Sequence, residues 1–176
     1  LGVLASLFFR PPAAPAATVV PPRRTEFQSL QRLTQIIQRG QTSAGVYRTL
    51  LESAVETVRA DAAWLDLNPT HAGADGAGAF LYHNLQADQA AELRTRLSSH
   101  DLPQGEFITN DLNVRPGFAG FPQRLRSLLQ LPLRGLNSTY GVLYLLKAEP
   151  NTFEPEDLSI LQTFTNQAVL SIENLE

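Results

Sequence analysis

The segment from Asn110 to Arg124 combines side chains that suit a small-molecule site. It mixes Asp, Asn, Pro, Gly and Phe, which is too irregular for a helix or strand and too aromatic for a plain solvated loop. Pockets for small molecules combine aromatic and apolar walls with a few polar groups. We therefore predict a ligand-binding pocket with wall residues Asp111, Arg115, Phe118, Phe121 and Arg124 over a floor of Tyr82, His83, Leu131 and Tyr144.

The absence of cysteine excludes several kinds of chemistry from this chain. Disulfides, thiolate metal sites, cysteine nucleophiles and thioether-linked chromophores all require a thiol. The sequence also shows no paired carboxylates at a defined spacing, no nucleophile with a neighbouring base and no cluster of metal ligands. We therefore expect no catalytic residues and no metal site, so that any enzymatic activity would belong to a domain outside this chain.

The three histidines are the candidate axial ligands for a haem. His71 lies in a Gly-rich loop and His100 is next to Asp101, so ordinary surface or core positions are the simpler interpretation. His83 lies on a predicted strand and is the one candidate for a ligand contact. The glycine-rich run 73–78 lacks the spacing and the following Lys-Ser/Thr of a phosphate loop, so we interpret it as a hairpin loop.

The overall composition is that of one folded domain. Apolar residues make up 43% of the 176 residues and charged residues 18%, close to the average for globular proteins. The net charge is −3, and the 14 basic residues form no cluster of the kind that binds phosphate backbones. Nucleic acid is therefore not expected as a partner.

The first 24 residues differ in composition from the rest. Residues 11–24 are rich in proline and alanine, which favours an extended linker. The apolar run Leu1–Phe9 is about half as long as the ~20 residues that a membrane-spanning helix needs, so no membrane contact is expected within this chain. We interpret residues 1–24 as an extension, a linker or the end of an upstream helix, and residues 25–176 as the folded domain. Because the sequence lacks methionine, we expect it to be a fragment or processed form, and a preceding membrane segment is left open.

Apolar periodicity predicts an alternation of helices and strands in this domain. The last helix begins at Glu154 or Pro155, where proline is tolerated and acidic residues favour the positive end of the helix dipole. In chain order we predict helices over 27–37 and 46–58, strands over 62–67 and 79–85, a helix over 88–98, strands over 106–109, 127–133 and 140–147, and a terminal helix over 155–175.

Five stretches in the last third of the chain resemble the closing signature of GAF domains. They are Leu128–Leu133 (LLQLPL), Tyr140–Leu145 (YGVLYL), Phe153–Leu158 (FEPEDL), Asn166–Ala168 (NQA) and Ile172–Asn174 (IEN). The order of the predicted elements resembles that family over residues 25–176. The resemblance implies an α+β fold in which an antiparallel sheet of about five or six strands carries the terminal helices on one face and a pocket-forming helix and loops on the other.

The resemblance also implies a sensory or regulatory function. GAF domains are input modules of signalling proteins such as sensor histidine kinases and nucleotide cyclases. We therefore expect this domain to be cytoplasmic, to bind a small molecule and to relay its state through the terminal helices to a covalently linked effector domain. The alternative is a ligandless module for dimerisation or spacing.

Several ligands of this family fit the sequence poorly. A covalent bilin and the methionine sulfoxide reductase activity both depend on cysteine, which is absent. The cyclic-nucleotide motif pairs Asn-Lys with a later Phe and an Asp-Glu pair, whereas the corresponding residues here are Leu146-Lys147, Phe153 and Asp157-Leu158. Haem and cyclic nucleotides are therefore not expected, and the identity of the ligand and of the effector stays open.

The apolar stripe of the terminal helix is wide enough for two contacts. The first and last helices of many GAF dimers pack against their copies in a parallel bundle. We therefore predict a homodimer whose helix contacts are Phe27, Leu30, Ile37, Ile160, Leu161, Phe164 and Ile172.

Overall fold

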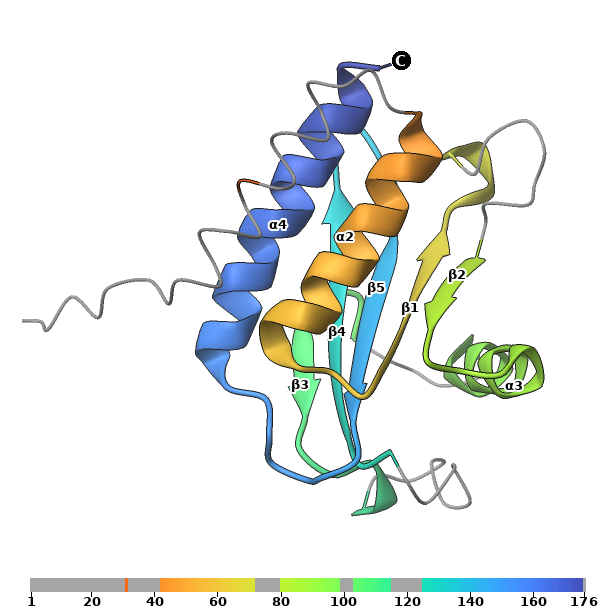
Figure 1. Cartoon of the computed structure of the whole chain (residues 1–176), viewed down its shortest axis with the longest axis vertical. Helices are drawn as coiled ribbons and strands as arrows, with labels where there is room; N and C mark the ends of the chain where they lie inside the picture. Colours follow the sequence, from red (N-terminus) through yellow and green to blue (C-terminus); the bar gives the residue numbers. More distant parts are fainter. Residues whose placement is uncertain (1–30, 32–41, 72–79, 99–102, 115–124, 176) are drawn as a thin grey trace, which may run out of the picture.

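The structure is a computed structural model that describes residues 31, 42–71, 80–98, 103–114 and 125–175 (Figure 1). Within these residues the chain forms a five-stranded sheet with helices on both faces. The elements in chain order are α2 (Ser43–Val58), β1 (Ala62–Leu67), β2 (Phe80–His83), α3 (Ala87–Ser98), β3 (Phe107–Thr109), β4 (Ser127–Arg134), β5 (Thr139–Lys147) and α4 (Pro155–Glu173).

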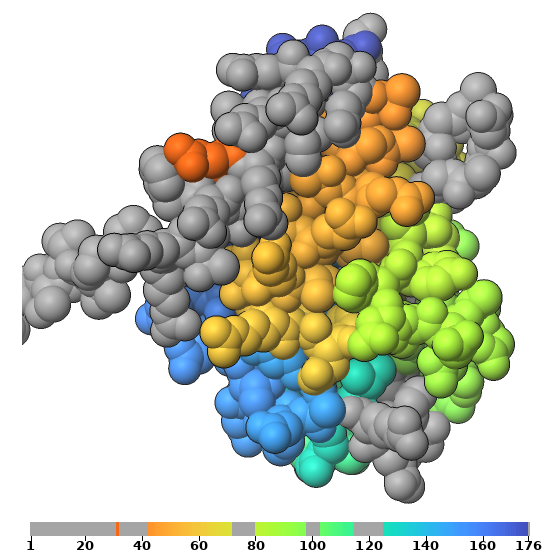
Figure 2. Space-filling model, viewed as in Figure 1, coloured from red at the N-terminus to blue at the C-terminus, as the bar shows by residue number. Residues whose placement is uncertain are grey.

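The sheet is antiparallel throughout, with the strand order β2-β1-β5-β4-β3. The helices α2 and α4 run side by side over one face of it (Figure 1). In the space-filling view α2 fills the middle of this face (Figure 2). The helix α3 packs on the opposite face, so the sheet separates the two long helices from α3.

The strands divide the apolar residues into two cores, because successive side chains of a strand point to opposite faces. The helix-side core lies between the sheet and the helices α2 and α4 and includes Leu65 and Phe164. The α3-side core lies on the other face and includes Trp64 and Leu93. Both faces of the central strands are therefore buried. A polar residue within these strands is expected to have a hydrogen-bond partner nearby.

The start of α4 is fixed by a reciprocal capping box. The backbone N–H of Glu154 donates to the Asp157 carboxylate at 3.0 Å, and Pro155 occupies the first turn, as the sequence predicts. Immediately before the helix, Phe153 is 5% exposed and packs into the helix-side core. These contacts set the direction in which the chain leaves β5 and crosses the sheet as α4.

The predicted α+β class and the order of elements from α2 to α4 are confirmed. The helix α2 begins earlier than predicted, at Ser43, because the side chain of Thr42 accepts a hydrogen bond from the Gly45 N–H at 3.4 Å and caps the helix there. The helix predicted over 27–37 and the domain start at residue 25 lie outside the described residues, apart from Gln31. Within the described ranges, none of the helices has the length and apolar character that crossing a membrane requires.

The dimer contacts predicted on α4 require correction. Leu161, Phe164 and Ile172 are fully buried in the helix-side core of one chain, so they are not available to a second chain. Ile160 is half-buried against the same core. The stripe is wide because α4 packs against both the sheet and α2. The remaining predicted contacts, Phe27, Leu30 and Ile37, lie outside the described residues.

Candidate functional site

A row of large side chains crosses the α3 face of the sheet. Strand pairing places Tyr82, Trp64, Tyr144, Gln130 and Phe107 side by side, one from each strand between β2 and β3. Cross-strand partners share a face of the sheet. The rings of Trp64 and Tyr144 are stacked, with centroids 4.6 Å apart. The row is therefore aromatic except for one amide, that of Gln130.

A cavity of about 310 Å³ opens over this row toward the β4–β5 hairpin, and we call it the hairpin cavity. Its volume lies at the small end of the range of ligand pockets, roughly 300–1,000 Å³. Its base comes from β4 and β5, and its wall comes from the end of α3 and the chain that follows it. The lining residues are Leu97, Pro103, Gln104, Gln130, Pro132, Arg134, Thr139, Val142 and Tyr144.

The amide of Gln130 is held in a fixed orientation in this cavity. Its Nε2 donates to the carbonyl oxygens of Pro103 at 2.7 Å and of Gly105 at 2.9 Å. Two carbonyl acceptors can be satisfied only by the nitrogen, which assigns the other amide atom as oxygen. That oxygen, Oε1, is buried and has no hydrogen-bond partner among the described residues. It is therefore an unsatisfied acceptor, with almost no accessible surface, of a residue that lines the cavity.

An ion pair holds α3 against the sheet beside the hairpin cavity. Arg94 on α3 contacts both carboxylate oxygens of Asp66 on β1, at 3.2 and 2.8 Å, and its guanidinium lies 5.1 Å from the centre of the Phe80 ring. Asp66 is paired with Val142, which lines the cavity. Burial, with a smaller contribution from the charge of Asp66, raises the pKa of Tyr144 to about 12. The Tyr144 hydroxyl therefore keeps its proton at neutral pH.

A second cavity of about 330 Å³ lies on the same face, beside the first turns of α3. Its polar groups have partners within the chain. The side chain of Asn84 donates to the Asp61 carbonyl at 2.6 Å, and the Ala148 N–H donates to the Asp61 carboxylate at 2.7 Å. Gln89 Oε1 accepts from a backbone N–H at 3.1 Å. The hairpin cavity is therefore the better candidate site. The second cavity is lined by Asp61, Ala62, Asn84, Leu85, Gln89, Leu93, Leu125 and Ala148.

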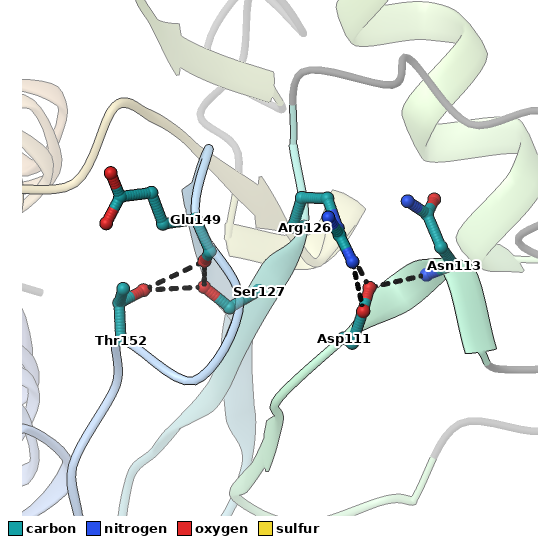
Figure 3. Close-up of polar contacts among 6 residues, drawn as sticks. All are labelled: Asp111, Asn113, Arg126, Ser127, Glu149 and Thr152. Carbon is teal, nitrogen blue, oxygen red and sulfur yellow. Dashed lines mark hydrogen bonds and ion pairs between the residues drawn. The ribbon is translucent and has the colours of Figure 1, made fainter.

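Asp111 forms an ion pair at the opposite end of β4 from the hairpin cavity (Figure 3). The Arg126 guanidinium donates to both of its carboxylate oxygens, with Nε 3.2 Å from Oδ1, and the Asn113 N–H donates to the same carboxylate at 3.0 Å. Beside it, the Ser127 hydroxyl donates to the Glu149 carbonyl at 2.6 Å. These contacts tie the chain on both sides of residues 115–124 to the end of the sheet.

We expect the ion pair to make the stability of the domain depend on pH. The hydrogen bonds from Arg126, helped by the Asn113 N–H and the guanidinium charge, hold the pKa of Asp111 below its usual range against a smaller opposing effect of burial. A carboxylate with a lowered pKa stabilises the fold above its unfolded-state pKa, and this stability is lost as the pH falls through its folded-state pKa. We expect Asp111→Asn to lose less stability than the wild type on acidification below about pH 4, measured by urea unfolding at a series of pH values.

The exposed Asp88, in the first turn of α3, provides the matched control for this experiment. Asp88→Asn removes one carboxylate without removing the ion pair, so its stability should fall with pH as that of the wild type does. Parallel curves for the wild type and Asp111→Asn would contradict the role of the pair.

The structure brings together only part of the predicted pocket. Tyr144 lines the hairpin cavity, and Tyr82 lies in the same cross-sheet row but lines neither cavity. Leu131 and His83 require correction. Leu131 is buried in the helix-side core, and His83 is paired with Ala63 of that core, so both lie on the other face of the sheet. Arg115, Phe118, Phe121 and Arg124 lie outside the described residues.

Two residues of the hairpin cavity, Gln130 and Arg134, were not predicted from the sequence, although a signal was present for the first. Gln130 is the one polar side chain in the run Leu128–Leu133, and both faces of that strand are buried. Asp66 interrupts the apolar strand β1 in the same way. A polar residue inside a strand with two buried faces indicates that its side chain forms hydrogen bonds within the fold.

Solved structures with this fold are similar to the chain over most of its length. The GAF domain of a phosphoenolpyruvate-protein phosphotransferase from Coxiella burnetii has a TM-score of 0.60 and 15% identity, with 85% of this chain and 94% of that chain covered. The GAF domain of a putative sensor histidine kinase from Pseudomonas syringae pv. tomato has a TM-score of 0.54 and 21% identity, with 85% and 86% covered. The free methionine-R-sulfoxide reductase from Neisseria meningitidis has a TM-score of 0.58 and 13% identity, with 84% and 88% covered.

At these identities the structural similarity shows the fold alone. A comparison with curated proteins finds no match. The family model of the GAF domain, however, matches residues 40–173, which is most of the chain and includes every strand of the sheet. The matched sequence and the observed fold agree, and the chain belongs to the GAF domain family.

Proposed function

We propose that this GAF domain is a regulatory input module that binds a small molecule in the hairpin cavity and relays its occupancy through α4 to an effector domain outside this chain. The observation that carries the proposal is the buried oxygen of Gln130, which has no partner among the described residues and belongs to a cavity wall. The sensor histidine kinase among the structural neighbours supports an effector of the signalling class.

The energetics of Gln130 favour a ligand that donates a hydrogen bond. A buried carbonyl oxygen without a partner costs about 1–3 kcal/mol relative to a paired one. The amide cannot rotate to relieve this cost, because its nitrogen is held by the carbonyls of Pro103 and Gly105. Because this oxygen has almost no accessible surface, an N–H or O–H group of a small molecule would gain that difference only when the cavity wall moves to admit it.

The β4–β5 hairpin supports the relay part of the proposal. Arg134 and Thr139, at the two ends of the turn, line the cavity. Between them the Leu136 N–H donates to the carboxylate of Glu173 at 3.0 Å, and Glu173 is the last residue of α4. A Cβ at Gly135 would lie 2.5 Å from that carboxylate, so the turn and the helix end are in close contact. A ligand that displaces the hairpin therefore changes a contact of the output helix.

Native mass spectrometry of the freshly purified chain, compared with the same sample after denaturation, tests this function. We expect the wild type to retain a small molecule and Gln130→Met to lose it, because methionine has a similar length but no amide. Gln89→Met, which makes the same change at the second cavity, should retain the molecule.

A wild-type chain that carries no bound mass and gains no thermal stability from nucleotides, haem or small metabolites would contradict the proposal. That result would favour the ligandless module. If a molecule is bound, hydrogen exchange at the Leu136 amide should differ between the bound and the ligand-free protein, because this amide joins the hairpin to α4.

A different observation favours the second candidate function, dimerisation. Leu170, near the C-terminal end of α4, is 53% exposed, and Leu175, just after the helix, is 46% exposed. We propose that this edge of α4, in place of the buried Leu161, Phe164 and Ile172, contacts a second chain in a homodimer. The same native mass spectra report the oligomeric state. Bound mass on the protein supports the ligand-binding function, whereas a dimer without bound mass supports the ligandless module.

A further inference from the structure

The hairpin cavity has an exposed positive charge at its rim and an apolar surface beside it. Arg134, the last residue of β4, is the one charged residue among the described residues that line the cavity, and its side chain is 58% exposed. Tyr144 and Val142 are half-buried, and Pro103 is exposed, so these three lining residues present apolar surface that a bound molecule can reach. The accessible lining therefore combines one cation with an aromatic and aliphatic wall.

The guanidinium of Arg134 is held only weakly by the chain. Its Nη2 lies 3.5 Å from the Gln104 carbonyl oxygen and 3.9 Å from a carboxylate oxygen of Glu106, both at the outer limit of such contacts. The Glu106 side chain is itself 39% exposed, and ion pairs between exposed side chains contribute little to stability. A second carboxylate can therefore displace Glu106 from this arginine at little cost.

The nearest acidic residue on the other side of the cavity does not oppose an anion. Asp66 acts electrostatically on Tyr144, which lines the cavity. Both carboxylate oxygens of Asp66 are in contact with Arg94, at 3.2 and 2.8 Å, so this negative charge is compensated within the chain. The charge that a ligand meets in the cavity is therefore set by Arg134 and its weak partner Glu106.

The volume of the cavity exceeds what an oxyanion alone would fill. It measures about 310 Å³, whereas one water molecule takes up roughly 30 Å³ in the liquid. A carboxylate at Arg134 leaves most of this space to the rest of the ligand. From these observations, and on the basis of the function proposed above, we propose that the hairpin cavity binds a small monocarboxylate with a compact apolar body, whose carboxylate replaces Glu106 as the partner of Arg134.

Three probes separate the charge of such a ligand from its apolar body. Benzoate has both, benzamide has the same ring without the charge, and acetate has the charge without the ring. Each is titrated into the isotope-labelled whole chain, and the amide chemical shifts of Val142 and Tyr144 report binding. We expect benzoate to bind with a Kd on the order of 1 mM, and benzamide and acetate to bind about fivefold more weakly or less, because each lacks one of the two contacts.

Two variants with opposite expected effects assign the charge preference to its residues. Arg134→Gln should reduce the affinity for benzoate to that for benzamide and leave benzamide binding unchanged. Glu106→Gln should strengthen benzoate binding about two- to threefold, because it removes the internal competitor for Arg134. A variant that merely disturbs the fold does not produce such a gain.

Two control variants make the same charge changes on the other side of the sheet. Arg48→Gln and Glu52→Gln lie at exposed positions of α2, which packs on the face opposite α3. Both should leave the affinities for all three probes unchanged. A change in benzoate affinity that follows the net charge in all four variants would overturn the assignment to Arg134 and Glu106.

Equal binding of benzoate by the wild type and Arg134→Gln, or binding of acetate as tight as that of benzoate, would overturn the ligand class. A Glu106→Gln variant that binds benzoate no better than the wild type would overturn the competition by Glu106. The proposed function fails separately. If native mass spectra show a retained neutral molecule that Gln130→Met releases, the cavity is a binding site and only the carboxylate class is wrong.

Discussion

Gly141→Ala is expected to lower the free energy of unfolding by about 2–3 kcal/mol, a large effect for one added methyl group. Gly141 is paired with Leu67 on β1 and with Leu133 on β4, in the middle of the sheet. A Cβ at this position would lie 2.4 Å from the backbone oxygen of Asp66 and 3.0 Å from the Cα of Leu67. Both atoms belong to the backbone of β1, so no side chain can rotate away, and β1 must move off β5.

Urea unfolding of the wild type and the variant measures this effect. Gly105→Ala is the matched control, because the nearest atom to its added Cβ is the end of the Arg134 side chain at 3.7 Å, an ordinary contact. We expect Gly105→Ala to stay within about 0.5 kcal/mol of the wild type. If the two variants lose equal stability, then β1 and β5 are not in the close contact described.

The skeleton of this fold could be predicted because its signals are local. The capping residues before α4 and the alternating apolar runs of β4 and β5 each specify an element within a few residues. Such features depend on the backbone of one segment and its immediate partner.

The site could be predicted only in part, because it depends on which face of the sheet each residue occupies. Tyr82 and His83 are adjacent and must point to opposite faces, so the predicted floor could not contain both. Leu131 lies on the same strand as Gln130, one position away, and this one step places it under α2 and α4. The amide oxygen of Gln130 became a candidate only when the two acceptors of its amide nitrogen, the carbonyls of Pro103 and Gly105, were placed.

The coupling of the site to α4 is likewise a property of the tertiary structure. Glu173 and Leu136 are far apart in sequence, and their hydrogen bond joins a helix end to a hairpin turn. The apolar stripe of α4 indicates that this face of the helix is buried. It does not show whether residues of the same chain or of a second chain cover it. The structure assigns the centre of the stripe to the core and leaves Leu170 and Leu175 at the surface.

Phe164→Ala is expected to lower the free energy of unfolding by about 3–5 kcal/mol and to leave the oligomeric state of the folded protein unchanged. Phe164 is fully buried among residues of α2, α4 and the sheet, so its removal leaves a cavity in the helix-side core. Urea unfolding measures the stability, and sedimentation at several protein concentrations measures the association of the folded chains.

Leu170→Ser is the matched change on the exposed side of the same helix. Because Leu170 is 53% exposed, its replacement should change the stability of one chain by no more than about 0.5 kcal/mol. If α4 forms the dimer contact through this edge, Leu170→Ser weakens association while Phe164→Ala does not. The reverse pattern, in which Phe164→Ala dissociates a dimer without a loss of stability, would mean that Phe164 contacts a second chain, as the sequence alone suggested.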